Sequence, residues 1–171
     1  IMGDEGHLYN GLTERTVEGM RKLVSHADYM VPNYTEAALI AGEPFKEDGL
    51  SWVAIKSLLG KLHRLGKGSV VITSAKVDGS DAVAGFDSGR GEFFLRTFDM
   101  IPVRCPGTGD IFSAIFIGNV MDGVSMMDSV DRAMMAVRQM IVLSRNSRDS
   151  FKGIPVESCL EVLDSCREDR K

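Results

Sequence analysis

The chain has 171 residues, 44% of them hydrophobic, which is enough for the core of one domain and argues against a disordered chain. Its formal net charge of -4 comes from acidic and basic residues mixed along the sequence, and this argues against a nucleic-acid-binding face. The three cysteines lack the paired spacing of a disulfide framework or zinc site, and no apolar run approaches the ~20 residues of a membrane span, so we expect a cytoplasmic protein.

Short apolar segments and helical patterns alternate along the chain. Residues 29–31 and 69–73 are apolar, rich in β-branched or aromatic side chains, and bounded by turn residues, so they predict buried strands. Pro155 opens a short final helix, and the longer helical patterns cover residues 17–24, 51–66 and 125–143. Strands that alternate with helices predict an α/β fold with a mostly parallel sheet covered on both faces.

One segment interrupts this alternation. Residues 82–86 and 92–97 flank the turn 87–91, and this pattern predicts an antiparallel hairpin at the edge of the sheet. We find no linker or repeat, so residues 1–171 are expected to form part of a single domain. A parallel sheet of only two or three strands would leave an exposed edge, so we also expect a preceding segment in the native protein.

A glycine-rich turn gives the strongest chemical signal. Residues 105–110 read Cys-Pro-Gly-Thr-Gly-Asp and lead directly into the apolar segment 111–117. The first amides of a helix have no partner within it, and glycines let a phosphate approach them, so Gly107, Thr108 and Gly109 predict an anion cradle. Asp110 would lie in the first turn, where a carboxylate can accept a proton from an attacking alcohol, although a capping role explains an Asp there equally well.

Four motifs in order resemble those of the ribokinase-like kinases. Gly-Thr-Gly-Asp at residues 107–110 is similar to the form found in pyridoxal kinases, whereas sugar kinases more often carry Gly-Ala-Gly-Asp. Met2-Gly3-Asp4 resembles the end of the family's Asp-Pro-x-x-Gly-Asp stretch, residues 27–36 resemble its Ala-Asp-x-x-x-Pro-Asn-x-x-Glu, and residues 70–74 resemble its Val-x-x-Thr-Ser strand end. The resemblance implies the C-terminal portion of a ribokinase-like three-layer sandwich, without the family's front portion.

The resemblance also implies an activity. It is the transfer of the ATP γ-phosphate to the 5'-hydroxymethyl group of pyridoxal, pyridoxine or pyridoxamine, with Asp110 as the general base that contacts this substrate alcohol. The amides of Gly107, Thr108 and Gly109 would stabilise the developing charge. Magnesium would lie near Glu36, a monovalent cation is a further possibility, and a homodimer is expected. The residues expected at ATP are Asp4, Asn33, Glu36, Thr73, Ser74, Met100, Ile101 and Thr108.

Several of these residues also have simpler interpretations. Asn33 and Glu36 match a capping box, Thr73 and Ser74 could be ordinary turn residues, and Met100 with Ile101 could belong to an apolar strand. Val31 stands where pyridoxal kinases often have Thr, which removes one oxygen near the cation. The alternative functions are a hydroxymethylpyrimidine kinase, a family that commonly carries Cys in place of Asp110, another ribokinase-like small-molecule kinase, or a nucleotide-binding fragment without catalysis.

Overall fold

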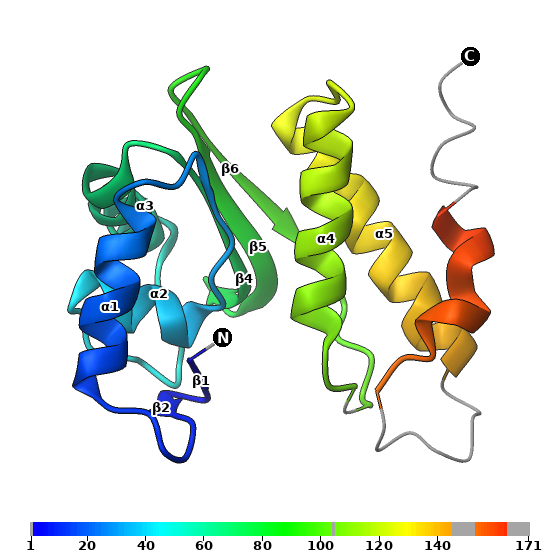
Figure 1. The fold of residues 1–171 in the computed structure, drawn as a ribbon, viewed down its shortest axis with the longest axis horizontal. Helices are drawn as coiled ribbons and strands as arrows, with labels where there is room; N and C mark the ends of the chain where they lie inside the picture. The colour runs from blue at the N-terminus through cyan, green and yellow to red at the C-terminus, as the bar shows by residue number, and fades with distance from the viewer. Residues whose placement is uncertain (1, 104, 145–152, 164–171) are drawn as a thin grey trace. The chain divides into compact units, whose positions relative to one another are not determined.

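The computed structural model describes residues 2–103, 105–144 and 153–163, and the chain divides into two compact units, Ile1–Asp99 and Met100–Lys171 (Figure 1). The expectation that residues 1–171 form part of a single domain stays a prediction. No helix among the described residues is long and apolar enough to cross a membrane.

The first unit contains a small two-stranded sheet, a four-stranded sheet and three helices. In chain order its elements are β1 (Gly3–Asp4), β2 (His7–Leu8), α1 (Glu14–Val24), β3 (Tyr29–Met30), α2 (Tyr34–Ala41), α3 (Trp52–Gly66), β4 (Ser69–Val77), β5 (Ser80–Asp87) and β6 (Glu92–Thr97). Strands β1 and β2 pair with each other, and the larger sheet has the order β3-β4-β5-β6. The helices and strands predicted from the sequence in this unit are therefore present, with longer bounds for β4.

The four-stranded sheet is mixed rather than mostly parallel. Strand β3 pairs with β4 in parallel, whereas the β4–β5 and β5–β6 ladders are antiparallel. The predicted hairpin is confirmed, since β5 and β6 pair in register and β6 lies at the sheet edge. What the sequence analysis missed is a second hairpin, because the strand expected at residues 69–73 continues to Val77 and turns back into β5. The α/β class therefore holds, with the antiparallel share of the sheet larger than expected.

Asp78 and Gly79 make this second hairpin possible. They are the two residues between β4 and β5, and both have a positive φ, 47° for Asp78 and 85° for Gly79. Two consecutive residues with positive φ form the turn whose twist matches that of paired strands, and Asp-Gly is a preferred sequence for it. The Asp78 carboxylate also accepts a hydrogen bond from the Trp52 amide at 3.2 Å, so this turn supports the start of α3.

The core of the first unit lies between the sheet and its helices, which Figure 1 shows on one side of β4 and β5. The α3 side chains that face this core are the ones the helical pattern predicted, Ile55, Leu58, Leu59 and Leu62. They pack with sheet residues such as Val70 and Ile72. On the other face, the Phe94 ring lies over its cross-strand partner Gly85, where a Cβ would collide with the ring. Gly85 therefore has to be a glycine for the Phe94 ring to lie there.

The second unit contains two long helices and a short turn of helix, α4 (Thr108–Met121), α5 (Met126–Ser144) and η2 (Val156–Cys159). All three were expected from the sequence. Ser125 caps α5 by accepting the Asp128 amide at 3.2 Å. Ile111 and Ile115 of α4 pack against a cluster that holds α5 and the C-terminal segment together and contains Ala136, Met140, Ile154, Cys159 and Val162. This packing fixes the start of α4, which carries the glycine-rich turn.

Candidate active site

The N-terminus of α2 is held by a reciprocal pair of hydrogen bonds. The Asn33 side-chain oxygen accepts the Glu36 amide at 2.8 Å, and the Glu36 carboxylate accepts the Asn33 amide at 3.1 Å. This is the capping box that the sequence predicted, and it satisfies amides that the helix itself cannot. A phosphate or magnesium role for these two residues stays a prediction.

The same turn of α2 also holds the N-terminal segment. The other oxygen of Glu36 accepts the Met2 amide at 2.6 Å, and the Asn33 side-chain amide donates to the Gly3 carbonyl at 2.8 Å. Thr35 adds a third contact, because its hydroxyl accepts the Gly6 amide at 2.9 Å. The three side chains at the start of α2 therefore bind the backbone of β1 and of the turn that follows it.

Two consequences follow for the predicted residues. Asp4 lies in β1, is exposed, and accepts the Glu5 amide at 3.0 Å, so the contacts to α2 place its backbone beside the capping box. Thr35 is a structural contact of this turn that the sequence analysis missed. It is 3% exposed, and its position directly before the capping Glu36 is the only signal in the sequence that could have indicated it.

Thr73 and Ser74 lie in β4 beside the end of β3. Thr73 forms a parallel bridge with Asn33, and its amide donates to the Pro32 carbonyl at 2.9 Å. Ser74 is exposed and has a φ of 54°, within the irregularity where the β4–β5 register shifts between Ile72 and Ala75. Such irregularities often redirect a side chain at a functional site. The structure thus brings together, in the first unit, Asp4, Asn33, Glu36, Thr73 and Ser74.

The glycine-rich turn is in the second unit, at the start of α4. Gly107 precedes the helix with a φ of 86°, which favours glycine, and it has no side chain to accept the first amides. A Cβ at Gly107 or Gly109 would meet no atom of the described residues within 4 Å. Asp110 is exposed in the first turn and Thr108 is half-buried. The start of α4 is therefore open to an anion, and the helix dipole favours negative charge there.

Met100 and Ile101 precede this turn in the second unit. Met100 is 59% exposed and Ile101 is half-buried, and the Ile101 carbonyl accepts the Val103 amide at 2.7 Å. No strand includes them among the described residues, so the simpler interpretation as an apolar strand is wrong. Their expected place in an adenine pocket stays a prediction.

A metal centre built only from protein ligands is absent from the part of the chain that the structure describes, because no three His, Cys, Asp or Glu side chains gather there. The carboxylate predicted at the cation, Glu36, already accepts two backbone amides. Each carboxylate oxygen can accept more than one hydrogen bond, so Glu36 keeps the capacity to hold a hydrated cation through water. The residues present therefore fit magnesium that retains most of its water ligands.

The mixed sheet with its helices, together with a glycine-initiated helix bearing an exposed aspartate, has the features of a ribokinase-like small-molecule kinase. Comparison with known proteins gives the same class. The model of the phosphomethylpyrimidine kinase family matches residues 7–153, so the chain belongs to this family of kinases.

Individual relatives include pyridoxal kinases. A pyridoxal kinase of Rubrobacter xylanophilus is 25% identical over 95% of this chain and 55% of its own length. A Bacteroides thetaiotaomicron structure described as a phosphomethylpyrimidine kinase, in a crystal form with pyridoxal, is 32% identical with a TM-score of 0.88 and covers 96% of this chain and 58% of its own. A pyridoxal kinase structure from Lactobacillus plantarum is 25% identical with a TM-score of 0.83, covering 99% of this chain and 61% of its own. The chain thus spans about half the length of the curated relatives it matches, 52% and 55%.

Proposed function

We propose that this chain is the nucleotide-binding and catalytic portion of a kinase that transfers the γ-phosphate of ATP to the 5'-hydroxymethyl group of a B6 vitamer. The observation that carries the proposal is the start of α4, where open glycine amides adjoin the exposed carboxylate of Asp110. Relatives named pyridoxal kinases, and the pyridoxal in the Bacteroides structure, support the choice of substrate class.

The phosphate chemistry belongs to the residues at the start of α4. Phosphoryl transfer spreads negative charge over the transferred group, and fixed backbone amides stabilise such charge without reorganising during the reaction. Gly107, Thr108 and Gly109 offer these amides at the positive end of the helix dipole, and the missing Cβ atoms leave room for close approach. Thr108 would add a hydroxyl to the same phosphates.

Asp110 has the role of general base in this proposal. Its carboxylate accepts the proton of the substrate hydroxyl as the oxygen attacks the γ-phosphorus and the bond to the β-phosphate oxygen breaks. Asp110 is exposed in the first turn of α4. It directly follows Gly107, Thr108 and Gly109, whose amides would hold the transferred group.

The residues of the first unit expected at ATP keep the roles that the resemblance implies. We assign Asp4, Asn33, Thr73 and Ser74 to the ATP phosphates. Asn33 supports this grouping, because it bridges to Thr73 of β4 and its side-chain amide donates to the Gly3 carbonyl next to Asp4. Glu36 would hold magnesium through water, and this cation would supply charge neutralisation between phosphate groups. Met100 and Ile101 are assigned to the adenine. The homodimer and a monovalent cation remain predictions from the resemblance.

A hydroxymethylpyrimidine kinase is the second candidate, and the description of the matching family favours it. Asp110 favours a B6 vitamer, because hydroxymethylpyrimidine kinases commonly carry Cys at the position that Asp110 resembles. Both substrates are ring-borne primary alcohols, so the same base and amide cradle would serve either. A third candidate is a nucleotide-binding fragment without catalysis.

A kinetic panel on the full-length protein tests the proposal. With saturating ATP and magnesium, kcat/KM is measured for pyridoxal, pyridoxine, pyridoxamine and 4-amino-5-hydroxymethyl-2-methylpyrimidine, and mass spectrometry identifies each product. We expect at least one B6 vitamer to exceed the pyrimidine by about tenfold or more, since a site that hydrogen-bonds its substrate rejects a mismatched ring strongly. A preference for the pyrimidine would establish the second candidate, and ATP binding without any product would establish the third.

A further inference from the structure

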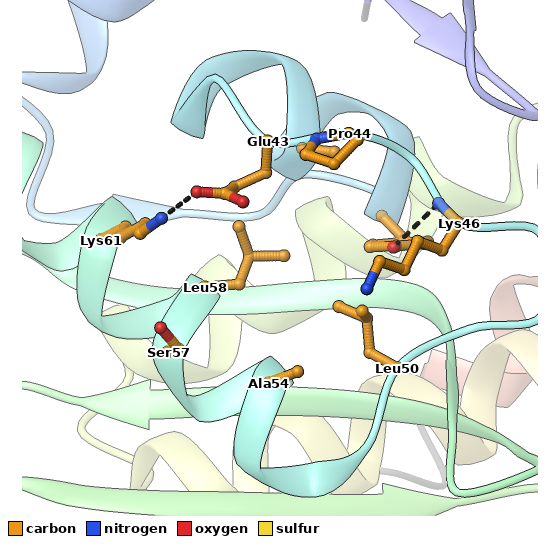
Figure 2. Close-up of a pocket in the computed structure, with 10 residues that line it drawn as sticks. Glu43, Pro44, Lys46, Leu50, Ala54, Ser57, Leu58 and Lys61 are labelled. Carbon is orange, nitrogen blue, oxygen red and sulfur yellow. Dashed lines mark hydrogen bonds and ion pairs between the residues drawn. The ribbon is translucent and has the colours of Figure 1, made fainter.

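A pocket of about 230 Å³ opens between α2, α3 and the loop that joins them in the first unit (Figure 2). Its lining contains none of the residues predicted for ATP, magnesium or the substrate alcohol. One wall is apolar and includes Leu50, Ala54 and Leu58. Small-molecule sites combine apolar walls of this kind with a few convergent polar groups, and drug-sized ligands need roughly 300–1,000 Å³, so a ligand here would be smaller.

Tyr34 supplies a buried polar group in this lining. It is 5% exposed, and its ring packs on Phe45 with centroids 4.9 Å apart. The Tyr34 hydroxyl oxygen accepts the Lys46 backbone amide at 3.3 Å, which leaves the phenolic proton available for donation. Burial raises the pKa of Tyr34 above its ordinary value of 10.0, so the group keeps this proton at neutral pH. Tyr34 can therefore donate a hydrogen bond to a bound ligand.

The charged lining groups have an excess of positive charge. Lys61 forms an ion pair with Glu43 on one side of the pocket. On the other side, Figure 2 shows the Lys46 ammonium next to Leu50, and no carboxylate among the described residues pairs with it. The lining thus contains two ammonium groups and one carboxylate, and that carboxylate pairs with Lys61 rather than with Lys46. An ammonium beside a neutral phenol donor suits an anionic group, because hydrogen bonds from a charged donor are the stronger ones.

We propose that this pocket is a second binding site, for a small organic anion with an apolar body. A carboxylate or phosphate group of the ligand accepts hydrogen bonds from the Lys46 ammonium and the Tyr34 hydroxyl, and its apolar part packs on Leu50 and Leu58. The Glu43–Lys61 ion pair bounds the far side and excludes a second anionic group near Glu43. The proposal stands independently of the reaction proposed above, since it uses none of the same residues.

Calorimetric titration of the full-length protein tests the site. The probes are benzoate, phenyl phosphate and the neutral analogue benzyl alcohol, all with a non-hydrolysable ATP analogue at saturation so that the amides of α4 are not available to the phosphate. We expect an anionic probe to bind with a dissociation constant of about 1 mM or tighter, in line with a ligand of this size. The neutral probe should bind about tenfold more weakly. The two anionic probes distinguish a carboxylate site from a phosphate site.

Three variants test whether the anion binds in this pocket and whether positive charge in the lining favours its binding. Lys46→Met keeps the apolar stem and should weaken the anion about tenfold or more, since a charged hydrogen bond is lost. Glu43→Gln should strengthen it several-fold, because a repelling carboxylate is removed and Lys61 is released. Lys22→Met, an exposed lysine of α1 outside the lining, is the matched control and should change nothing. Equal binding of benzyl alcohol, no binding of either anion, or an unchanged Lys46→Met variant would each overturn the proposal.

Discussion

Glu36 and Asn33 hold each other's backbone amides, and the same Glu36 carboxylate also holds the amide of Met2 at 2.6 Å. The Glu36 side chain is therefore more than the second half of a capping box. It joins the start of α2 to a segment 34 residues earlier in the chain. Any test of Glu36 as a cation-binding residue has to separate the cation from these two hydrogen bonds.

Glu36→Gln makes this separation possible. The amide side chain has one carbonyl oxygen, so one of the two backbone amides loses its acceptor, and the free energy of unfolding should fall by about 1–3 kcal/mol. If Glu36 also holds hydrated magnesium, the magnesium concentration for half-maximal activity should rise in the full-length enzyme. Denaturant unfolding and a magnesium titration of the initial rate measure the two effects.

Thr35→Val is the matched control for that experiment. It removes the hydrogen bond to the Gly6 amide from a buried site in the same turn, and it keeps the shape of the side chain. We expect a comparable loss of stability with an unchanged magnesium requirement, because no carboxylate is altered. If Glu36→Gln needs no more magnesium than Thr35→Val, Glu36 has a structural role alone.

Asp110→Asn tests the general base. Asn suits the first turn of a helix about as well as Asp, so the melting temperature and the affinity for ATP should stay close to those of the wild type. A positioned base contributes typically ~10²–10⁴-fold, so kcat for the B6 vitamer should fall by about that factor. Stopped-flow or coupled assays at saturating ATP give kcat, and a thermal melt gives stability. A kcat within about threefold of the wild type, with normal melting, would refute the assignment.

Gly109→Ala separates the amide cradle from the stability of α4. Gly109 is a helical residue, and a Cβ there would meet no described atom within 4 Å, so the substitution should stabilise the fold by about 0.5–1 kcal/mol. If phosphates approach these amides closely, the same methyl group should raise KM for ATP or lower kcat. Thermal unfolding and steady-state kinetics with varied ATP provide both measurements.

Gly118→Ala provides the comparison within the same helix. Gly118 is also exposed in α4, and a Cβ there likewise meets nothing within 4 Å among the described residues. It should stabilise the fold to a similar extent and leave the kinetics unchanged, because it lies about three turns from the start of the helix. Normal kinetics in both variants would show that phosphate does not approach the Gly109 backbone.

The Tyr34 phenol should make the free energy of unfolding depend on pH in the alkaline range. Burial raises its folded-state pKa above 10.0, while the hydrogen bond from the Lys46 amide acts in the opposite direction. Because the unfolded chain then loses the phenolic proton first, the free energy of unfolding decreases as the pH rises above the unfolded pKa of 10.0. Tyr34→Phe should remove this part of the pH dependence, which urea unfolding between about pH 8 and pH 11 would measure.

Tyr34→Phe also removes a hydrogen bond, and this second effect on stability can be told apart from the titration of the phenol. Without the hydroxyl, the Lys46 amide loses its acceptor, so the variant should be less stable at every pH. That effect shifts the whole curve, whereas the titration of the phenol changes its slope. Parallel curves for the two proteins above pH 10 would contradict a raised pKa for Tyr34.

Features that depend on near neighbours in the chain were predictable from the sequence. The capping box at Asn33 and the glycine turn before α4 were located correctly, because each is formed by residues a few positions apart in the chain. The family followed from motifs of the same local kind. The roles assigned to those motifs in binding and catalysis are a separate matter and stay predictions.

Strand pairing was only partly predictable. The Asp78-Gly79 pair is a local hairpin signal that the sequence analysis missed, since Ser74 interrupts the apolar pattern and made β4 end early at Thr73. Ser74 sits in the irregularity where the register shifts, and pairing with β5 carries the strand past it to Val77. A strand that continues through an irregularity is stabilised by its partner and not by its own pattern.

The sequence by itself therefore determined the family, the α/β class, the helix starts and the glycine-initiated turn, all of which depend on residues close together in the chain. Only the tertiary structure decided which distant groups meet. It joined Glu36 to Met2 and Thr35 to Gly6, and it placed Tyr34 of α2 and Lys61 of α3 around one pocket. Contacts of this kind arise when helices pack on a sheet, and that packing depends on the whole core rather than on any local pattern.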